Sequence, residues 1–498
     1  MMALAQNFPF FSIVLAMFAG IISSVLPGKA AKWLNTLVIT AVGAMSGWLL
    51  VFLCRTGEPF VYWMGHFPAP WGNELRAGLL EAGMALVFAV IMLFSLVGGR
   101  PRLELEVSEE KQNLYYILTN LLLSSLLVMV YTNDLFTAYV FVEINTIAAC
   151  GLIMIREIGR TIEAAVRYMI MSLLGSGLFL IGICILYDLT GHLLMSNIKQ
   201  SLALIVADGT YTAPLLTTIG LMSAGLAIKS ALFPFHSWLP DAYGYSTVSS
   251  SAMLSSLVSK GYLFLQIKIF YRVIGLDVIT NSQVIHILFL FGLMGMIFGS
   301  LSAIRENDIR RMISFSSVAQ IGYIYMGFGL GTELGMIASV YHIISHAATK
   351  SLLFLSAVGI TDASGGSKRF LDLTGAGYRN KIAGVAFSVG CLSMVGIPMF
   401  AGFVSKLLFA QAAVGHTYKT LPALLVLAVS TILNAIYFMK TVIRIYTPQR
   451  EEVQYAVPPQ HFGTRKVTLL ALVVLNVAMG MLSQPIVSWI QAGLAMFG

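Results

Sequence analysis

Seven ionisable residues lie inside apolar stretches of this sequence, where charged groups are rare. Four are lysines in four separate stretches, one is a glutamate and two are histidines: Lys229, Lys260, Lys350, Lys406, Glu143, His342 and His346. A charged group at the centre of a membrane helix costs at least about 2.5 kcal/mol on insertion scales, and such residues normally face a partner or water. The pattern therefore predicts a path for protons or cations through buried groups.

The two histidines and Lys350 share one predicted helix. His342, His346 and Lys350 are four residues apart, which places them on one face in a stripe about 12 Å long. Histidine changes its charge near neutral pH and can pass protons in either direction. A polar stripe that only holds helices together is an alternative, but such a stripe requires no charge. A haem site is another, but it needs histidines from two helices, and no second buried histidine is well placed.

Two of the predicted membrane spans are interrupted by proline. Pro234 follows Lys229 and Pro398 precedes Lys406. Proline removes a backbone donor from a helix, and in lipid the freed carbonyls must face protein or a wet cavity. Matched broken helices in two halves of a chain indicate the binding site of a transporter.

Two further groups are weaker candidates. His236 follows Pro234 and is either a local hydrogen-bonding group or a proton carrier. Asp134 lies near the end of a predicted span, where we expect that protons could reach the path from water.

The elements that carry these residues are expected to be membrane helices. Of the 498 residues, 58% are hydrophobic and 10% are charged, whereas a soluble domain has about 25% charged residues. We predict an all-α polytopic membrane protein, a single membrane domain over 1–498 with about fourteen spans of roughly 20 residues. Residues 113–272 (spans 4–8) and 283–445 (spans 9–13) are predicted to form two inverted repeats, with spans 7 and 12 discontinuous. The spans begin near Phe8, Trp33, Leu79, Asn113, Asp134, Ala165, Pro214, Ser246, Gln283, Met312, Leu334, Ile382, Leu421 and Val467.

The distribution of lysine and arginine predicts the orientation. The loops after odd-numbered spans hold 20 of them and the loops after even-numbered spans hold 6. Cytoplasmic loops carry the excess of positive charge, so both termini are predicted on the outer face. We expect no cleaved signal peptide.

Several function classes are disfavoured. No cysteine lies in CxxC spacing, which argues against iron–sulfur, zinc-ribbon and disulfide frameworks in this chain. A phosphate-binding loop is missing, so ATP is not the expected driver. The net charge of +8 comes without a basic stripe interleaved with aromatics, so nucleic acid is not an expected partner.

Six motifs, taken in their order along the chain, resemble one family of membrane proteins. That family comprises the antiporter-like subunits of complex I, the Mrp-type cation/proton antiporters and the membrane-bound hydrogenases. The aromatic-rich segment from Asp134 to Glu143 is more similar to the D-type Mrp component and the hydrogenases. Met399 departs from its pattern, since proline normally follows the position of Pro398. The motifs are Asn133-Asp134 to Glu143, Lys229 to Ala242, Lys260-Gly261-Tyr262, Asp308 to Tyr323, His342 to Lys350, and Gly396 to Lys406.

The resemblance implies an ion-translocating subunit of a redox-driven complex, either membrane-bound hydrogenase or NADH-quinone oxidoreductase (complex I-like), in a prokaryotic cell membrane. It implies other membrane subunits as partners, with H⁺ and Na⁺ as candidate ions. No catalytic residue, metal ligand or cofactor is expected in this chain, and any iron–sulfur clusters would belong to partner subunits. A component of an Mrp-type Na⁺/H⁺ antiporter is the first alternative, and a scaffold subunit that has lost transport is the second.

The buried residues suggest a relay along the membrane plane. Glu143 and Lys229 would form an ion pair, and their separation would release the lysine's proton. Lys260 and the histidine face would then carry the proton to Lys406, which would exchange it with the outer side.

Overall fold

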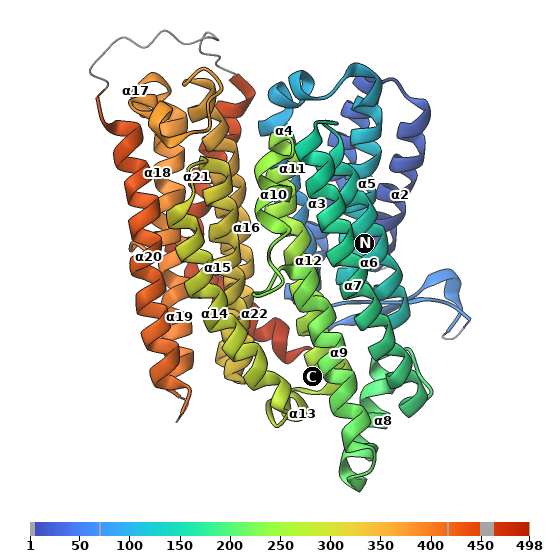
Figure 1. The fold of residues 1–498 in the computed structure, drawn as a ribbon. Coiled ribbons are helices and arrows are strands. Elements are labelled where there is room, and N and C mark those ends of the chain that lie inside the picture. Colours follow the sequence, from blue (N-terminus) through green and yellow to red (C-terminus); the bar gives the residue numbers. More distant parts are fainter. Residues whose placement is uncertain (1–4, 69–70, 416–417, 449–462, 498) are drawn as a thin grey trace.

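The computed structural model describes residues 5–68, 71–415, 418–448 and 463–497, which form a bundle of helices standing side by side (Figure 1). The first part of the chain contributes α2 (Phe8–Val25), α3 (Gly28–Thr56), β1 (Phe60–Trp63), η1 (Met64–His66), β2 (Glu74–Ala77), α4 (Leu79–Glu106), α5 (Glu109–Tyr131), α6 (Leu135–Met154), α7 (Gly159–Thr190), α8 (Met195–Asp208), α9 (Thr212–Ser230), α10 (Leu239–Tyr245), α11 (Val248–Met253), η2 (Leu254–Val258), α12 (Ser259–Lys268), η3 (Ile269–Ile274) and α13 (Leu276–Thr280).

The second part lies at the other side of the bundle in Figure 1. It contributes α14 (Gln283–Arg305), α15 (Ile309–Leu330), α16 (Glu333–Asp362), η4 (Phe370–Leu373), α17 (Ala376–Arg379), α18 (Lys381–Val395), α19 (Ala401–Val414), α20 (Thr420–Tyr446), α21 (Gly463–Met481) and α22 (Ser483–Ala495).

Ten helices of the described residues are long and apolar enough to cross a membrane: α2, α3, α4, α5, α6, α7, α9, α14, α16 and α20. The pair α21 and α22 passes the same test together, with a bend of 75° between them. The chain is therefore a mostly helical, multi-pass membrane protein with ten or eleven candidate spans. The sequence predicts about fourteen, and the additional ones fall on the continuous but less apolar helix α15 and on shorter or broken helices.

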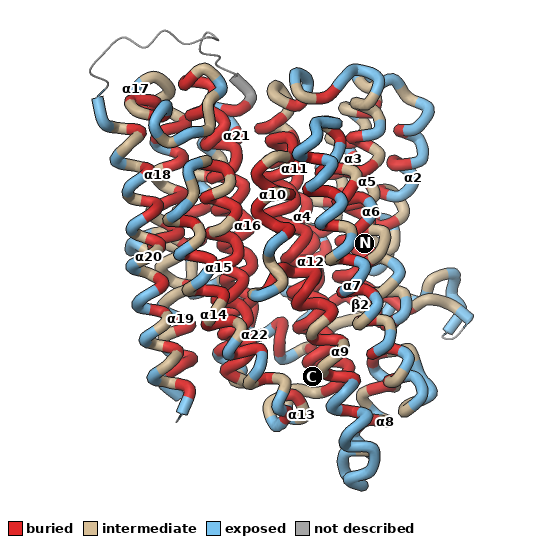
Figure 2. Tube along the Cα trace, in the orientation of Figure 1, coloured by how far each residue is buried: buried red, intermediate tan, exposed pale blue. Residues whose placement is uncertain are grey.

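Burial changes gradually from the centre of the bundle to its outside. α16 is buried along almost its whole length, and α12 beside it is buried throughout (Figure 2). The outer helices α2, α3 and α20 expose large apolar side chains, among them Trp33 at 65% and Ile443 at 67%. In water such a surface would be unfavourable, whereas in a bilayer it faces hydrocarbon. The polar residues of α12 and α16 thus lie where lipid cannot reach them.

One feature outside the helices is a hairpin of two short strands. β1 and β2 pair antiparallel, from Phe60 opposite Ala77 to Trp63 opposite Glu74. Leu75 of β2 also bridges to Thr132 beyond α5, and Arg76 donates to the carbonyl of Met496 at 2.6 Å. The hairpin therefore ties the loop between α3 and α4 to the rest of the bundle.

Two helices begin with the same arrangement at opposite ends of the bundle. Asp134 caps α6 by accepting from the Thr137 backbone N–H, and Asp308 caps α15 by accepting from two backbone N–H groups. Such side-chain acceptors satisfy donors that the first helical turn leaves free. Each aspartate also bridges to a loop about sixty residues later, Asp134 to Leu194 and Asp308 to Arg369.

Candidate functional site

Glu143 and Lys229 form an ion pair between α6 and α9. The Lys229 Nζ atom lies 3.3 Å from Glu143 Oε1, with the lysine side chain fully buried and the glutamate side chain 24% exposed. Lys229 also donates to Thr146 Oγ1 at 2.8 Å, and Ser176 of α7 donates to Glu143. A buried charge is tolerated when it is paired and hydrogen-bonded, and both conditions hold here.

Two glycines let the helices that carry this pair approach one another. A Cβ atom on Gly225 would lie 2.5 Å from the carbonyl oxygen of Gly175, so neither position has room for a side chain. This close contact of α7 and α9 brings Ser176 and Lys229 to the same carboxylate.

Lys229 stands immediately before the first predicted helix break. α9 ends at Ser230, Ala231 has a left-handed backbone with φ of 64°, and helix resumes only at Leu239. A left-handed conformation is costly for any residue other than glycine and is held by its surroundings. The predicted discontinuity after Lys229 therefore exists in the structure, and His236 lies within it, with its ring stacked on Phe233 at 5.4 Å.

Tyr262, two residues after Lys260 on α12, lies beside Lys229. The Lys229 Nζ atom is 5.5 Å from the Tyr262 ring centre, and the Tyr262 hydroxyl donates to Asn145 Oδ1 at 3.0 Å. Lys260 is fully buried and donates to the carbonyl oxygen of Ser255 at 2.5 Å. Ser255 belongs to η2, a π-helical segment, and such segments occur frequently at functional sites.

The stripe predicted on one helix is present on α16. The rings of His342 and His346 stack in parallel with centres 5.6 Å apart, and His342 Nδ1 lies 2.5 Å from Ser405 Oγ. Neither ring nitrogen of His346 has a hydrogen-bond partner among the described residues. Buried polar atoms are rarely left without partners, so this imidazole has free capacity for water or a proton.

Lys350 lies on the same face of α16, about two turns after His342. It donates to the Ile313 carbonyl at 2.7 Å and to Ser316 Oγ at 2.5 Å, and no carboxylate pairs with it among the described residues. Lys260 on α12 and the histidine face of α16 are all buried, and the two helices pack against one another.

Lys406 lies in the first turns of α19, after the second predicted break. It donates to the Val395 carbonyl at 2.6 Å and to Thr431 Oγ1 at 3.1 Å. Between α18 and α19, Gly396 and Met399 have φ angles of 92° and 79°. Proline is fixed near −65°, so the proline typical of the resembling family could not adopt this backbone, whereas Met399 adopts it at a cost in strain.

These groups form clusters rather than one chain of direct contacts. Tyr323 joins two of them, since its ring stacks on His342 at 5.7 Å and lies 5.7 Å from Lys406 Nζ. Among the residues that the structure describes, no hydrogen bond or ion pair joins Lys229 to Lys260 or Lys350 to Lys406. Proton transfer between the clusters therefore requires water or side-chain motion.

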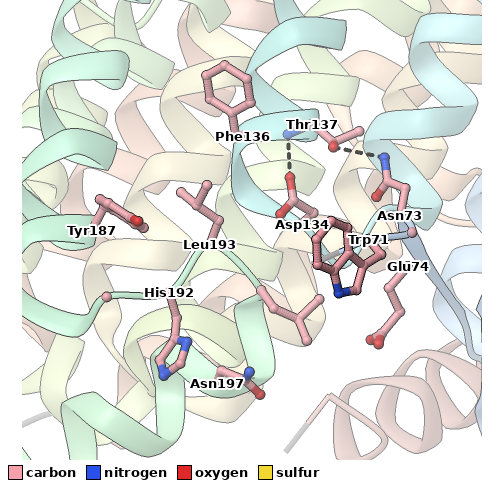
Figure 3. Close-up of a pocket in the computed structure, with 13 residues that line it drawn as sticks. Trp71, Asn73, Glu74, Asp134, Phe136, Thr137, Tyr187, His192, Leu193 and Asn197 are labelled. Atoms are coloured by element: carbon pink, nitrogen blue, oxygen red, sulfur yellow. Dashed lines mark hydrogen bonds between the residues drawn. The ribbon is translucent and has the colours of Figure 1, made fainter. Parts of the chain in front are cut away.

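Asp134 lies apart from these clusters, on the wall of a cavity of about 680 Å³ (Figure 3). Glu74, Asn73 and His192 line the same cavity. Glu74 accepts from Asn133 at 2.6 Å, next to the cap that Asp134 provides for α6. Asp134 thus lines a cavity and makes a capping contact that the sequence alone did not reveal.

Two buried cations and one buried carboxylate are not among the candidates that the sequence suggests. Lys268 is fully buried and donates to the carbonyls of Met129, Val130 and Thr132. Glu81 is 1% exposed and pairs with Arg272 at 3.1 Å. The helical segment that contains both cations continues to Ile274, and the apolar residues between Lys268 and Ile274 are the signal that could have indicated this.

A serine–tyrosine–glutamine chain beside Lys229 also went unnoticed in the sequence. Ser230 Oγ lies 2.8 Å from the Tyr325 hydroxyl, which donates to Gln266 Oε1 at 2.7 Å.

Within the described ranges, no group of three or more histidine, cysteine, aspartate or glutamate side chains could hold a metal ion.

Comparison with known proteins identifies the family. Residues 132–433 match the family model described as NADH:quinone oxidoreductase/Mrp antiporter, TM. The NADH-quinone oxidoreductase subunit N of Desulforudis audaxviator is 31% identical, covering 97% of this chain and 98% of its own.

Two solved complexes contain chains of the same shape. One is the membrane-bound sulfane sulfur reductase, an archaeal respiratory membrane complex, with a TM-score of 0.86, 25% identity and coverage of 99% of this chain and 97% of that one. The other is the Mrp complex of Dietzia sp. DQ12-45-1b, with a TM-score of 0.87, 23% identity and the same coverage. The resemblance read from the six motifs is confirmed, and the chain belongs to the NADH:quinone oxidoreductase/Mrp antiporter family of antiporter-like membrane subunits.

Proposed function

We propose that this chain translocates protons or cations as the pumping subunit of a multisubunit, redox-driven complex in a prokaryotic cell membrane. The observation that carries the proposal is the Glu143–Lys229 pair, a buried lysine held against a carboxylate next to a helix break. Similarity to subunit N of an NADH-quinone oxidoreductase over nearly the whole chain supports a redox-driven complex. The iron–sulfur clusters and electron carriers would belong to partner subunits.

The relay would run along the membrane plane. Separation of Glu143 from Lys229 would leave the lysine charge without its counterion and push its proton toward Lys260. The α16 face, formed by His342, His346 and Lys350, would pass the proton on, and Lys406 would exchange it with the outer side. His346 supports this route because its nitrogens are free among the described residues.

The finer topology is also part of the proposal. Four further spans would complete fourteen: α11 to η3 taken together, α15, the short pair α18 and α19, and the bent pair α21 and α22. The two repeats, 113–272 and 283–445, are supported by the matching caps at Asp134 and Asp308 at opposite ends of the bundle. Both termini would lie on the outer face.

A Lys229→Ala variant tests the relay. With the complex purified at native abundance and reconstituted in vesicles, we expect ion pumping to fall to background. Lys29→Ala, which removes an exposed lysine in the first turn of α3, should leave pumping unchanged. Full pumping by the Lys229→Ala variant would refute the relay and favour the scaffold alternative.

A component of an Mrp-type antiporter is the second candidate, because the family description includes both kinds of complex. Gentle-detergent purification followed by mass spectrometry of every co-purifying subunit separates them. Subunits with iron–sulfur clusters and a nickel or quinone site would establish a redox pump. Small hydrophobic partners alone would establish an Mrp-type antiporter that exchanges H⁺ for Na⁺.

A further inference from the structure

A small cavity opens beside α20, and none of the relay residues lines it. It measures about 260 Å³ and lies where the end of α14, the start of α15 and η4 meet α20. Tyr437, Lys440, Thr441 and Arg444 of α20 form one wall, and Glu306 and Phe370 lie on the others. The cavity thus combines polar groups with an apolar floor.

The charges that line this cavity are unbalanced. Lys440 and Arg444 are one helical turn apart, and neither side chain makes a hydrogen bond or ion pair with the described residues. The acidic residue in the wall, Glu306, is already engaged, since Arg311 Nε lies 3.0 Å from its carboxylate. The cavity therefore offers two positive charges that have no counterion among the described residues.

An apolar groove continues from the cavity along the outside of α20. It measures about 440 Å³, shares Lys440 and Arg444 with the cavity, and is otherwise lined mainly by apolar residues such as Ile436, Met439 and Ile443. Ile436 and Ile443 are 47% and 67% exposed, as expected of side chains that face acyl chains. The two cations thus stand between a polar recess and a lipid-facing surface.

We propose that the recess and groove bind an anionic phospholipid, with the phosphate between Lys440 and Arg444 and an acyl chain along Ile436 and Ile443. Basic pockets between membrane helices on the cytoplasmic side are suited to such headgroups. Favourable interaction with the end of the helix explains cations in the last turns of α20, but it does not account for the cavity and groove that adjoin them. The leaflet follows from the orientation proposed above, whereas binding itself does not depend on that orientation.

The test measures bound lipid on the intact, detergent-purified complex. After delipidation, phosphatidylglycerol or phosphatidylcholine is titrated in, and binding is followed by native mass spectrometry. The Lys440→Gln/Arg444→Gln variant should bind phosphatidylglycerol about 30-fold more weakly at this site, because each basic group near a membrane surface is worth about 1 kcal/mol and 1.4 kcal/mol is tenfold. The control is Arg369→Gln/Lys381→Gln, which removes two exposed cations that line neither the cavity nor the groove.

The outcomes are distinct. Selective loss of phosphatidylglycerol binding in the α20 variant, with the control unchanged, supports the site. Equal binding by all three proteins, or equal binding of phosphatidylcholine and phosphatidylglycerol by the unaltered one, overturns it. Cross-linking through a photoreactive residue at position 443 adds a second readout: a lipid adduct supports the proposal, and an adduct to a partner subunit alone refutes it. None of these measurements depends on ion pumping, so the lipid site can be disproved while the relay proposal still stands.

Discussion

Replacing Glu81 with glutamine removes the carboxylate from a buried ion pair. Arg272 Nη1 lies 3.1 Å from Glu81 Oε1, and both side chains are 2% exposed. At an effective dielectric constant of about 20, unit charges at that distance attract by about 5 kcal/mol. Loss of one partner from a buried pair costs about 3–5 kcal/mol. The Nε and Nη2 atoms of Arg272 have no partner in the described part of the chain, so little else would compensate for the missing carboxylate.

The expected loss can be measured as a melting temperature. With about 2.1 cal/mol/K of unfolding entropy per residue, cooperative unfolding of 498 residues corresponds to about 1 kcal/mol per degree, so Glu81→Gln should lower Tm by about 3–5 °C. The assay is the monodisperse fraction of detergent-solubilised protein after heating. Glu104→Gln is the matched control: its pair with Lys32 is 2.9 Å long, but the side chains are 43% and 21% exposed. Exposed pairs contribute less than about 1 kcal/mol, so this control should shift Tm by less than about 1 °C.

A double variant separates lost pairing from lost volume. Replacing both Glu81 and Arg272 with methionine should recover most of the loss, because apolar groups of similar size can replace a buried pair at little cost. Similar small shifts for Glu81→Gln and Glu104→Gln would refute the reasoning. A double variant no more stable than Glu81→Gln would refute it equally.

Three further predictions concern other parts of the chain. Burial and the nearby Arg310 charge lower the pKa of Lys368, in the loop after α16, to about 7. An unfolded lysine titrates near 10.4, so between about pH 7 and 10 the unfolded chain binds more protons than the folded chain, and stability rises with pH. The Lys368→Gln variant should therefore show a smaller rise in Tm between pH 6.5 and 9.5, and an unchanged slope would contradict this prediction. A Cβ on Gly402 would lie 1.7 Å from the Ser393 carbonyl oxygen, so Gly402→Ala should sharply reduce both the yield and the Tm. A Cβ on Gly415 would meet no atom within 4 Å, so Gly415→Ala should change neither, and equal yields of the two variants would show that the contact at Gly402 is dispensable. Cys54 is exposed at the end of α3, so a variant with only this cysteine should react with a membrane-impermeant maleimide added outside; labelling only after lysis would reverse the proposed orientation.

The sequence predicted the broken helices because their signals are local. Pro234 and Pro398 cannot continue a helix, and both breaks occur where the prolines indicate. Four-residue spacing likewise predicted the shared face of His342, His346 and Lys350, because helix geometry fixes which residues align.

Contacts between distant segments could not be predicted in this way. Nothing local to Arg272 indicates that Glu81, 191 positions earlier, lies against it, because this pairing depends on how α4 packs beside η3. The strand pairing of β1 and β2 was also missed, since each strand has only four residues. Hydroxyl partners such as Ser176 and Tyr325 escaped notice for a similar reason: serine and tyrosine occur throughout membrane helices, and only the packed structure shows which of them meet a charge or another polar side chain.

The π-helical segment before Lys260 determines where in this helix a residue can be lost without moving that lysine. A π turn holds about one residue more than an α turn, so deleting one residue within Leu254–Val258 would restore regular α-helix there and leave the helix beyond it in nearly the same orientation. Deleting one residue from α11 while the π turn persists would instead rotate everything after it by about 100°, because an α-helix has 3.6 residues per turn. Lys260 would then turn away from α16 although no charged residue had been lost. In a gene for this protein, a missing codon in α11 would therefore separate the two halves functionally, whereas a missing codon a few positions later would leave Lys260 facing α16.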